Sequence, residues 1–161
     1  MVGSPSSKHY TKRIRGMETQ KTRVIFLCCH NAVTSQMAEA FVKHYVGDKF
    51  DVFSAGLKPE NIHPMTAQVM QEIGINLSSH KAEPLRKYWG KTTFDYLITV
   101  CTKAEQECFI FPGVSHRLHW PIEHVVTSDQ HVSADLEKFR EIRNLVGKMA
   151  RSWLKQILLK P

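Results

Sequence analysis

The stretch RVIFLCCHNAVTS, residues 23–35, opens with a run of apolar, β-forming residues and closes with polar loop residues. A continuous apolar run is typical of a strand buried on both faces of a parallel sheet, so we expect a strand over 23–28. From Ser35 onward, apolar residues recur every three or four positions as far as Gly47, which predicts an amphipathic helix closed by that glycine. The order strand, loop, helix is typical of an α/β domain.

Candidate strands and helices alternate along the rest of the chain. We expect further strands over 51–54, 94–101 and 117–120, and further helices over 64–74, 83–89 and 133–159. Such alternation implies right-handed crossovers and a three-layer α/β fold, an open four-stranded parallel sheet with helices on both faces. Sheets of this kind bind ligands beyond the carboxyl ends of their strands, where Cys28 and Cys101 both fall.

Length and charge argue for one core and against nucleic acid. A chain of 161 residues with 42% hydrophobic content can bury one sizeable core. Six basic residues and one glutamate precede position 24, so about +5 of the net charge of +7 lies there and the remainder is nearly neutral. We therefore expect a basic, disordered tail over residues 1–21, one domain over 22–161, and no nucleic-acid partner.

The apolar runs and the cysteines bear on the compartment. The longest uncharged apolar run is far shorter than the roughly 20 residues needed to cross a bilayer, and no apolar segment follows the basic residues near the start. A cytoplasmic protein without a membrane partner is expected. Its four cysteines are then expected to have catalytic, redox or metal-binding roles rather than to form structural disulfides.

The segment after the first strand has the features of an anion site. Successive backbone N–H groups and a helix N-terminus converge there, and a thiol at the start of such a loop is expected to have a lowered pKa. Cys28 is therefore a candidate nucleophile. A buried structural cysteine at a strand end is an equally common arrangement and is the alternative interpretation of Cys28.

The longer stretch VIFLCCHNAVTSQMAEAF, residues 24–41, resembles the opening of low-molecular-weight tyrosine phosphatases and, more closely, of thioredoxin-coupled arsenate reductases. Their loop reads Cys, five residues, Arg, Ser. In this register Cys28 falls on the nucleophile, Asn31 on the asparagine that braces the turn, and Ser35 on the serine that supports the thiolate. The resemblance extends over roughly 22–159 through the segments FSAG (53–56), EIGI (72–75), FDYLITVC (94–101), FPG (111–113) and HW (119–120). It implies the low-molecular-weight phosphatase type of fold.

The loop departs from the family at its oxyanion clamp. Behind Cys28 the candidate oxyanion loop comprises Cys29, His30, Asn31, Ala32, Val33, Thr34 and Ser35. Thr34 stands where the family has arginine, whose two charge-assisted hydrogen bonds are each worth about 1.5–3 kcal/mol, against about 1 kcal/mol for one hydroxyl bond. Such a loss in a transition state corresponds to a rate deficit on the order of a thousandfold or more.

Two further loop positions differ, and the general acid is replaced. His30 replaces a glycine and Val33 a second loop cysteine; a protonated His30 supplies part of the missing charge, or it is a solvent-exposed histidine without a ligand role. Near the family's catalytic aspartate this chain has Glu123 and His124, which are the candidate general acids.

Cys101 and Cys108 are separated by six residues, a spacing that resembles the arsenate reductases and not the phosphatases. The resemblance implies that Cys28 attacks the oxyanion, Cys101 displaces arsenite, and Cys108 then takes over Cys101 across a mobile polar segment, residues 102–107. We expect a Cys101–Cys108 link to form more readily than any bridge to Cys29, whose side chain is expected to point away from the loop. The alternatives are two packing cysteines, or zinc held by the three thiols with His30 or His124.

These observations predict an arsenate reductase-like thiol oxidoreductase with catalytic residues Cys28, Cys101 and Cys108. The expected partners are a small oxyanion (arsenate, phosphate or sulfate) and thioredoxin or a similar reductant, and no cofactor or metal is expected. A catalytically impaired oxyanion-binding or partner-binding domain of the same fold is the alternative. Protein tyrosine phosphatase activity is the third candidate, because it depends most on the missing arginine and aspartate.

Overall fold

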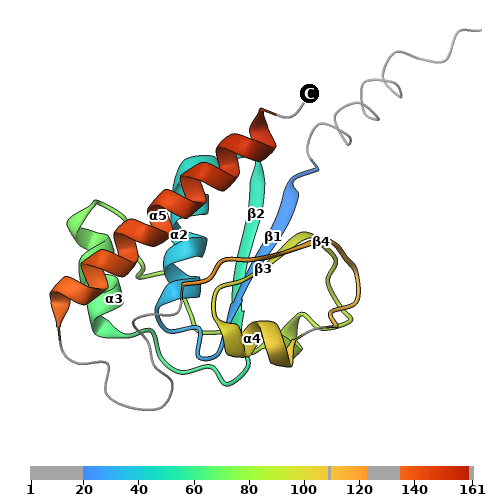
Figure 1. Cartoon of the computed structure of the whole chain (residues 1–161), viewed down its shortest axis with the longest axis horizontal. Helices are drawn as coiled ribbons and strands as arrows, with labels where there is room; N and C mark the ends of the chain where they lie inside the picture. Colours follow the sequence, from blue (N-terminus) through green and yellow to red (C-terminus); the bar gives the residue numbers. More distant parts are fainter. Residues whose placement is uncertain (1–19, 109, 123–134, 160–161) are drawn as a thin grey trace, which may run out of the picture.

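Four parallel strands form the centre of the computed structural model, which describes residues 20–108, 110–122 and 135–159. The strands are β1 (Thr22–Cys28), β2 (Phe50–Gly56), β3 (Phe94–Thr99) and β4 (Val114–His119). Their order across the sheet is β2-β1-β3-β4, and every neighbouring pair is parallel (Figure 1). The predicted four-stranded parallel α/β sheet is confirmed.

Helices cover both faces of this sheet, as the alternation predicted. Helices α2 (Thr34–Val46), α3 (Pro64–Glu72) and α5 (Leu136–Leu158) share one apolar core with one face of the sheet. The short helix α4 (Thr102–Glu107) and the 3₁₀ turn η1 (Leu85–Lys87) lie with a second, smaller core on the other face (Figure 1).

Strand β1 contributes to both cores, which explains its continuous apolar sequence. Val24, Phe26 and Cys28 belong to the larger core, whereas Ile25 and Leu27 belong to the smaller one. Successive side chains of a strand point to opposite faces, so the part of a central strand that has a helix layer on each side, here residues 24–28, is apolar. This alternation also directs the Cys28 thiol toward the α2 side of the sheet.

Three elements depart most from the prediction. The helix expected over 83–89 is only the 3₁₀ turn η1. Strand β4 begins at Val114 rather than 117, because it is an edge strand with exposed polar residues and has no apolar run to mark its start. Residues 102–107, expected as a mobile segment, form α4, and the Cys101 sulfur caps it by accepting the N–H of Ala104 at 3.4 Å.

The expected basic tail falls almost wholly on residues 1–19, which lie outside the described residues. Within the part that the structure describes, no helix is long and apolar enough to cross a membrane.

Candidate active site

The loop between β1 and α2 is fastened through its carbonyl groups to the connection between β2 and α3, residues 57–63. The carbonyl oxygens of Cys28, Cys29, His30 and Ala32 accept the N–H groups of Leu57 (3.2 Å), Lys58 (2.8 Å), Glu60 (2.8 Å) and His63 (3.1 Å), respectively. With these carbonyls turned toward residues 57–63, the loop presents its N–H groups on the opposite side. Backbone N–H groups gathered in this way form an anion-binding nest.

The Cys28 thiol lies inside this nest. Its side chain is buried, and its sulfur is 2.8 Å from the Ser35 hydroxyl oxygen. The backbone N–H of Asn31 donates to the same sulfur at 3.1 Å, and the backbone N–H of Ser35 adds a further bond. This arrangement supplies hydrogen bonds to a thiolate at the carboxyl end of a central strand.

The expected lowered pKa of Cys28 is wrong for this structure. Burial raises the pKa of the thiol above its ordinary value of 9.0, the hydrogen bond from Ser35 opposes this rise, and the neighbouring Cys101 adds to it. Burial dominates because removing a thiolate from water costs more than two or three hydrogen bonds return when no arginine is present.

Asn31 braces the loop from within. It is fully buried and has a positive φ of 53°, a conformation that asparagine adopts more readily than most residues. Its amide nitrogen donates to the hydroxyls of Ser35 (2.8 Å) and Ser54 (2.9 Å). Its amide oxygen accepts the N–H of Glu83 (2.9 Å) and the side chain of Gln36 (3.0 Å).

Gly56, at the end of β2, allows the loop to lie close to the sheet. A Cβ atom at this position would come within 2.8 Å of the Cys29 carbonyl oxygen and 2.9 Å of the Asn31 nitrogen. Both are backbone atoms and cannot rotate away. Only glycine therefore fits beneath the loop.

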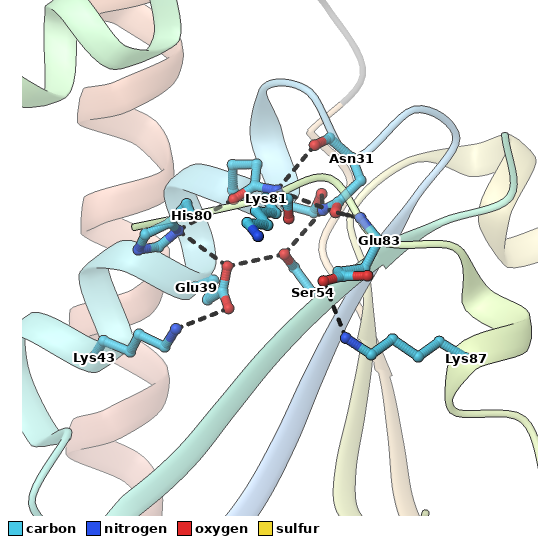
Figure 2. Close-up of polar contacts among 10 residues, drawn as sticks. Asn31, Glu39, Lys43, Ser54, His80, Lys81, Glu83 and Lys87 are labelled. Carbon is cyan, nitrogen blue, oxygen red and sulfur yellow. Dashed lines mark hydrogen bonds and ion pairs between the residues drawn. The ribbon is translucent and has the colours of Figure 1, made fainter. Parts of the chain in front are cut away.

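A buried polar network lies behind the loop (Figure 2). Glu39 of α2 accepts the Ser54 hydroxyl at 3.0 Å and pairs with Lys43 at 3.0 Å. The His80 Nδ1 atom is 3.1 Å from Glu39 and 3.1 Å from the amide oxygen of Gln36. Sequence reasoning missed these residues, although two polar side chains three positions apart on the core-facing side of α2 were a signal for it.

The carboxyl of Glu39 has a shifted pKa. Burial raises this pKa, but the hydrogen bonds and charges of His80 and Lys43 lower it further, so that it lies below its ordinary value of 4.5. Glu39 is therefore held as a carboxylate inside the domain.

The position of the missing arginine is filled without a charge. Thr34 is buried as the first residue of α2, and Val33 and Ala32 before it pack on the larger core. The His30 Nδ1 atom donates to the Lys58 carbonyl oxygen (3.2 Å) and lies 3.6 Å from the Glu60 carboxylate. It therefore engages the 57–63 connection, on the side of the loop away from the N–H groups, rather than the place where an oxyanion would bind.

The three remaining cysteines are distributed differently from the expectation. The Cys29 sulfur lies 3.8 Å from that of Cys101, although a Cys101–Cys108 link was expected to form more readily than any bridge to Cys29. Both side chains are partly exposed. Cys108 is buried in the smaller core at 2% exposure, at the far end of α4. All four cysteines are free thiols.

Helix α4 is fastened to the sheet by Glu105. Its carboxylate accepts the Thr99 hydroxyl of β3 and pairs with Arg117 of β4 at 3.2 Å. Arg117 also donates to the Glu105 carbonyl at 3.4 Å. The segment between Cys101 and Cys108 is therefore an anchored helix in this structure.

The candidate acids Glu123 and His124 lie outside the described residues. Among the residues that are described, no three His, Cys, Asp or Glu side chains are arranged to hold a metal ion.

The chain is similar in sequence and in fold to known proteins. The family described as low molecular weight phosphotyrosine protein phosphatase matches residues 23–160. An arsenate reductase of Halalkalibacterium halodurans is 30% identical over 83% of this chain and 95% of its own length. A solved arsenate reductase in a phosphate-binding state superposes with a TM-score of 0.67 at 27% identity, covering 84% of this chain and 98% of its own.

A solved thioredoxin-dependent arsenate reductase of Corynebacterium glutamicum is also similar. It superposes with a TM-score of 0.65 at 28% identity, covering 94% of this chain and 73% of its own.

Proposed function

This chain belongs to the low-molecular-weight phosphotyrosine protein phosphatase family, and from that premise we propose that it is an arsenate reductase-like thiol oxidoreductase. The main support for this function is the Cys28 sulfur, which accepts hydrogen bonds inside the loop. The carbonyl groups of this loop are hydrogen-bonded to residues 57–63 on the opposite side. A nucleophilic thiol and an N–H nest share one end of the sheet. That combination suits attack on a small tetrahedral oxyanion such as arsenate, phosphate or sulfate.

The first half of the reaction uses Cys28 and Cys101. The Cys28 thiolate attacks the arsenic atom of arsenate, an oxygen leaves as water, and a sulfur–arsenic bond forms. Cys101 then attacks the Cys28 sulfur, and the electron pair of the sulfur–arsenic bond stays with arsenic, which leaves as arsenite. Arsenic gains two electrons, and the two thiols lose them by forming a Cys28–Cys101 disulfide.

A dithiol reductant of the thioredoxin class completes the cycle in this proposal. Support comes from the thioredoxin-dependent relative and from the partial exposure of Cys29 and Cys101 at the protein surface. The resemblance assigns the intermediate disulfide to Cys101 and Cys108, which requires α4 to open first.

The loop also supports a second candidate, an oxyanion-binding or partner-binding domain without turnover. Thr34 gives no charge to stabilise the oxyanion, and burial raises the pKa of Cys28, so both changes weaken catalysis more than binding by the N–H nest. Phosphatase activity ranks third, because it needs both the clamp and an acid.

The test is thioredoxin-coupled turnover of arsenate, measured as arsenite released, by wild type, Thr34→Arg and Cys28→Ser. We expect slow turnover by wild type, an increase on the order of a thousandfold in Thr34→Arg, and none in Cys28→Ser. If neither wild type nor Thr34→Arg releases arsenite while calorimetry still detects phosphate binding, the binding-domain candidate replaces the enzyme.

A further inference from the structure

The thiols of Cys29 and Cys101 lie close together beyond the carboxyl ends of β1 and β3. Their sulfurs are 3.8 Å apart, one at the start of the oxyanion loop and the other at the N-cap of α4. A disulfide bond is about 2.05 Å long. An approach of about 1.8 Å separates this pair from bonding.

Cys108 lies much farther from Cys101 in the folded protein. The two residues flank all six residues of α4, and seven steps along a helix at about 1.5 Å each place their Cα atoms about 10 Å apart. Two cysteines with Cα atoms more than about 7 Å apart cannot be bridged without backbone movement. Such movement must break the contacts of Glu105 with Thr99 and Arg117 and expose a buried thiol.

We propose, resting on the function proposed above, that Cys29 is the resolving thiol of this enzyme, which takes over the disulfide from Cys101. The Cys29 thiolate attacks the Cys101 sulfur of the Cys28–Cys101 disulfide. The Cys28–Cys101 bond breaks, a Cys29–Cys101 bond forms, and Cys28 leaves as a thiolate that receives the proton given up by Cys29. No electrons are gained or lost in this exchange, so it needs no further oxidant.

The surroundings of Cys29 favour attack at this stage of the cycle. In the reduced protein, burial, the adjacent thiols of Cys101 and Cys28, and a hydrogen bond with Cys101 raise the pKa of Cys29 to about 12, and only Lys103 lowers it. Once Cys28 and Cys101 are joined as a disulfide, neither can carry a negative charge. Burial is then the remaining influence that raises the pKa of Cys29, and the ammonium of Lys103 lowers it. The pKa of Cys29 therefore falls at the stage at which its attack is required.

The product also suits a protein reductant. Cys29 and Cys101 are both partly exposed, whereas Cys28 and Cys108 are buried. Exchange from Cys28–Cys101 to Cys29–Cys101 therefore moves the disulfide away from the buried nucleophile toward the surface and restores Cys28 for the next turnover.

The experiment has one arm with arsenate and one without it. In the first, full-length wild type, Cys29→Ser and Cys108→Ser react with arsenate in the absence of reductant, are quenched with N-ethylmaleimide, and are mapped by non-reducing mass spectrometry. We expect a Cys29–Cys101 link in wild type and Cys108→Ser, and an accumulated Cys28–Cys101 link in Cys29→Ser. In thioredoxin-coupled turnover, Cys29→Ser should lose at least about tenfold more kcat than the matched Cys108→Ser variant.

The second arm is independent of arsenate. Diamide takes up two hydrogens from a nearby thiol pair, and in Cys28→Ser it should join Cys29 to Cys101. A Cys101–Cys108 link in either arm, a failure of diamide to join Cys29 to Cys101, or a larger loss of turnover in Cys108→Ser would overturn the assignment. If diamide joins Cys29 to Cys101 but no protein releases arsenite, the pairing is supported and the proposed substrate is wrong.

Discussion

A single N–H group of His80, at Nδ1, lies 3.1 Å from the carboxylate of Glu39 and 3.1 Å from the amide oxygen of Gln36. Both partners are acceptors, so Nδ1 carries the hydrogen. Gln36 in turn donates to Asn31 inside the oxyanion loop. A histidine remote in sequence thus fixes the helix residues that hold the loop.

Replacing Glu39 by glutamine should flatten the acid limb of the stability curve. The pKa of Glu39 lies below 4.5 in the fold because His80 and Lys43 outweigh burial, so its contribution is present above the unfolded value and is lost as pH falls through the folded value. Urea unfolding at pH 7 should show a loss of about 1–3 kcal/mol in Glu39→Gln, and this loss should shrink as the pH falls below the ordinary carboxyl pKa of 4.5. Glu141→Gln, exposed on α5, is the control. Parallel curves for wild type and Glu39→Gln would contradict this.

Substitution of Asn31 should separate its backbone role from its hydrogen bonds. Asn31→Ala removes the hydrogen bonds of Asn31 with the Ser35 and Ser54 hydroxyls and with the N–H of Glu83, and it puts alanine at a φ of 53°. We expect a loss of about 3 kcal/mol in unfolding free energy and weaker phosphate binding by calorimetry. Asn31→Gly removes the same hydrogen bonds, but glycine adopts a positive φ without strain. Asn31→Gly should therefore be about 1 kcal/mol more stable to unfolding than Asn31→Ala. Equal stabilities of the two variants would show that the torsion costs nothing.

A methyl group at Gly56 should disturb the loop directly. Its Cβ would meet backbone atoms of Cys29 and Asn31 at 2.8 and 2.9 Å, so Gly56→Ala should destabilise the domain by about 1–3 kcal/mol and weaken anion binding. Gly90→Ala provides a control, because its Cβ would meet nothing within 4 Å although its φ is +68°. It should lower thermal stability without changing phosphate affinity. Unchanged phosphate affinity in Gly56→Ala would refute the packing argument.

Releasing α4 should expose Cys108. In the native fold Cys108 is 2% exposed, and Glu105 ties its helix to Thr99 and Arg117. Glu105→Ala should raise the rate of Cys108 alkylation several-fold, since local opening becomes easier. Glu107→Ala, which removes only a surface contact with Lys103 at 4.0 Å, is the matched control. The rates are read by mass spectrometry over time, and equal rates in both variants would mean that Glu105 does not hold the helix.

The parts of this fold that could be predicted are those whose sequence pattern reflects burial. Strand β1 is apolar over residues 24–28 because both of its faces are covered there, and α5 shows its buried side in residues such as Phe139, Ile142 and Val146. Strand β4 and helix α4 could not be placed in the same way. The first is a half-exposed edge strand, and the second is a short polar helix that depends on the tertiary contacts of Glu105.

The candidate site also has parts that could be predicted from the sequence and parts that could not. The loop around Cys28 was predictable because its parts are contiguous in sequence. The network of Gln36, Glu39 and His80 was not, because it joins residues up to 44 positions apart. The approach of Cys29 to Cys101 depends on which way a loop side chain turns after a strand ends, and period-two alternation does not extend beyond the last strand residue.

The connection over residues 57–63 has no regular secondary structure, yet four of its N–H groups are held by loop carbonyls. In deuterium exchange, we therefore expect as long a protection as in the neighbouring strands for the amide hydrogens of Leu57, Lys58, Glu60 and His63. These amide hydrogens should exchange still more slowly when an oxyanion binds in the nest and rigidifies the loop. The labelling pattern of an irregular connection is thus a direct reporter of occupancy at the loop whose carbonyl groups bind it.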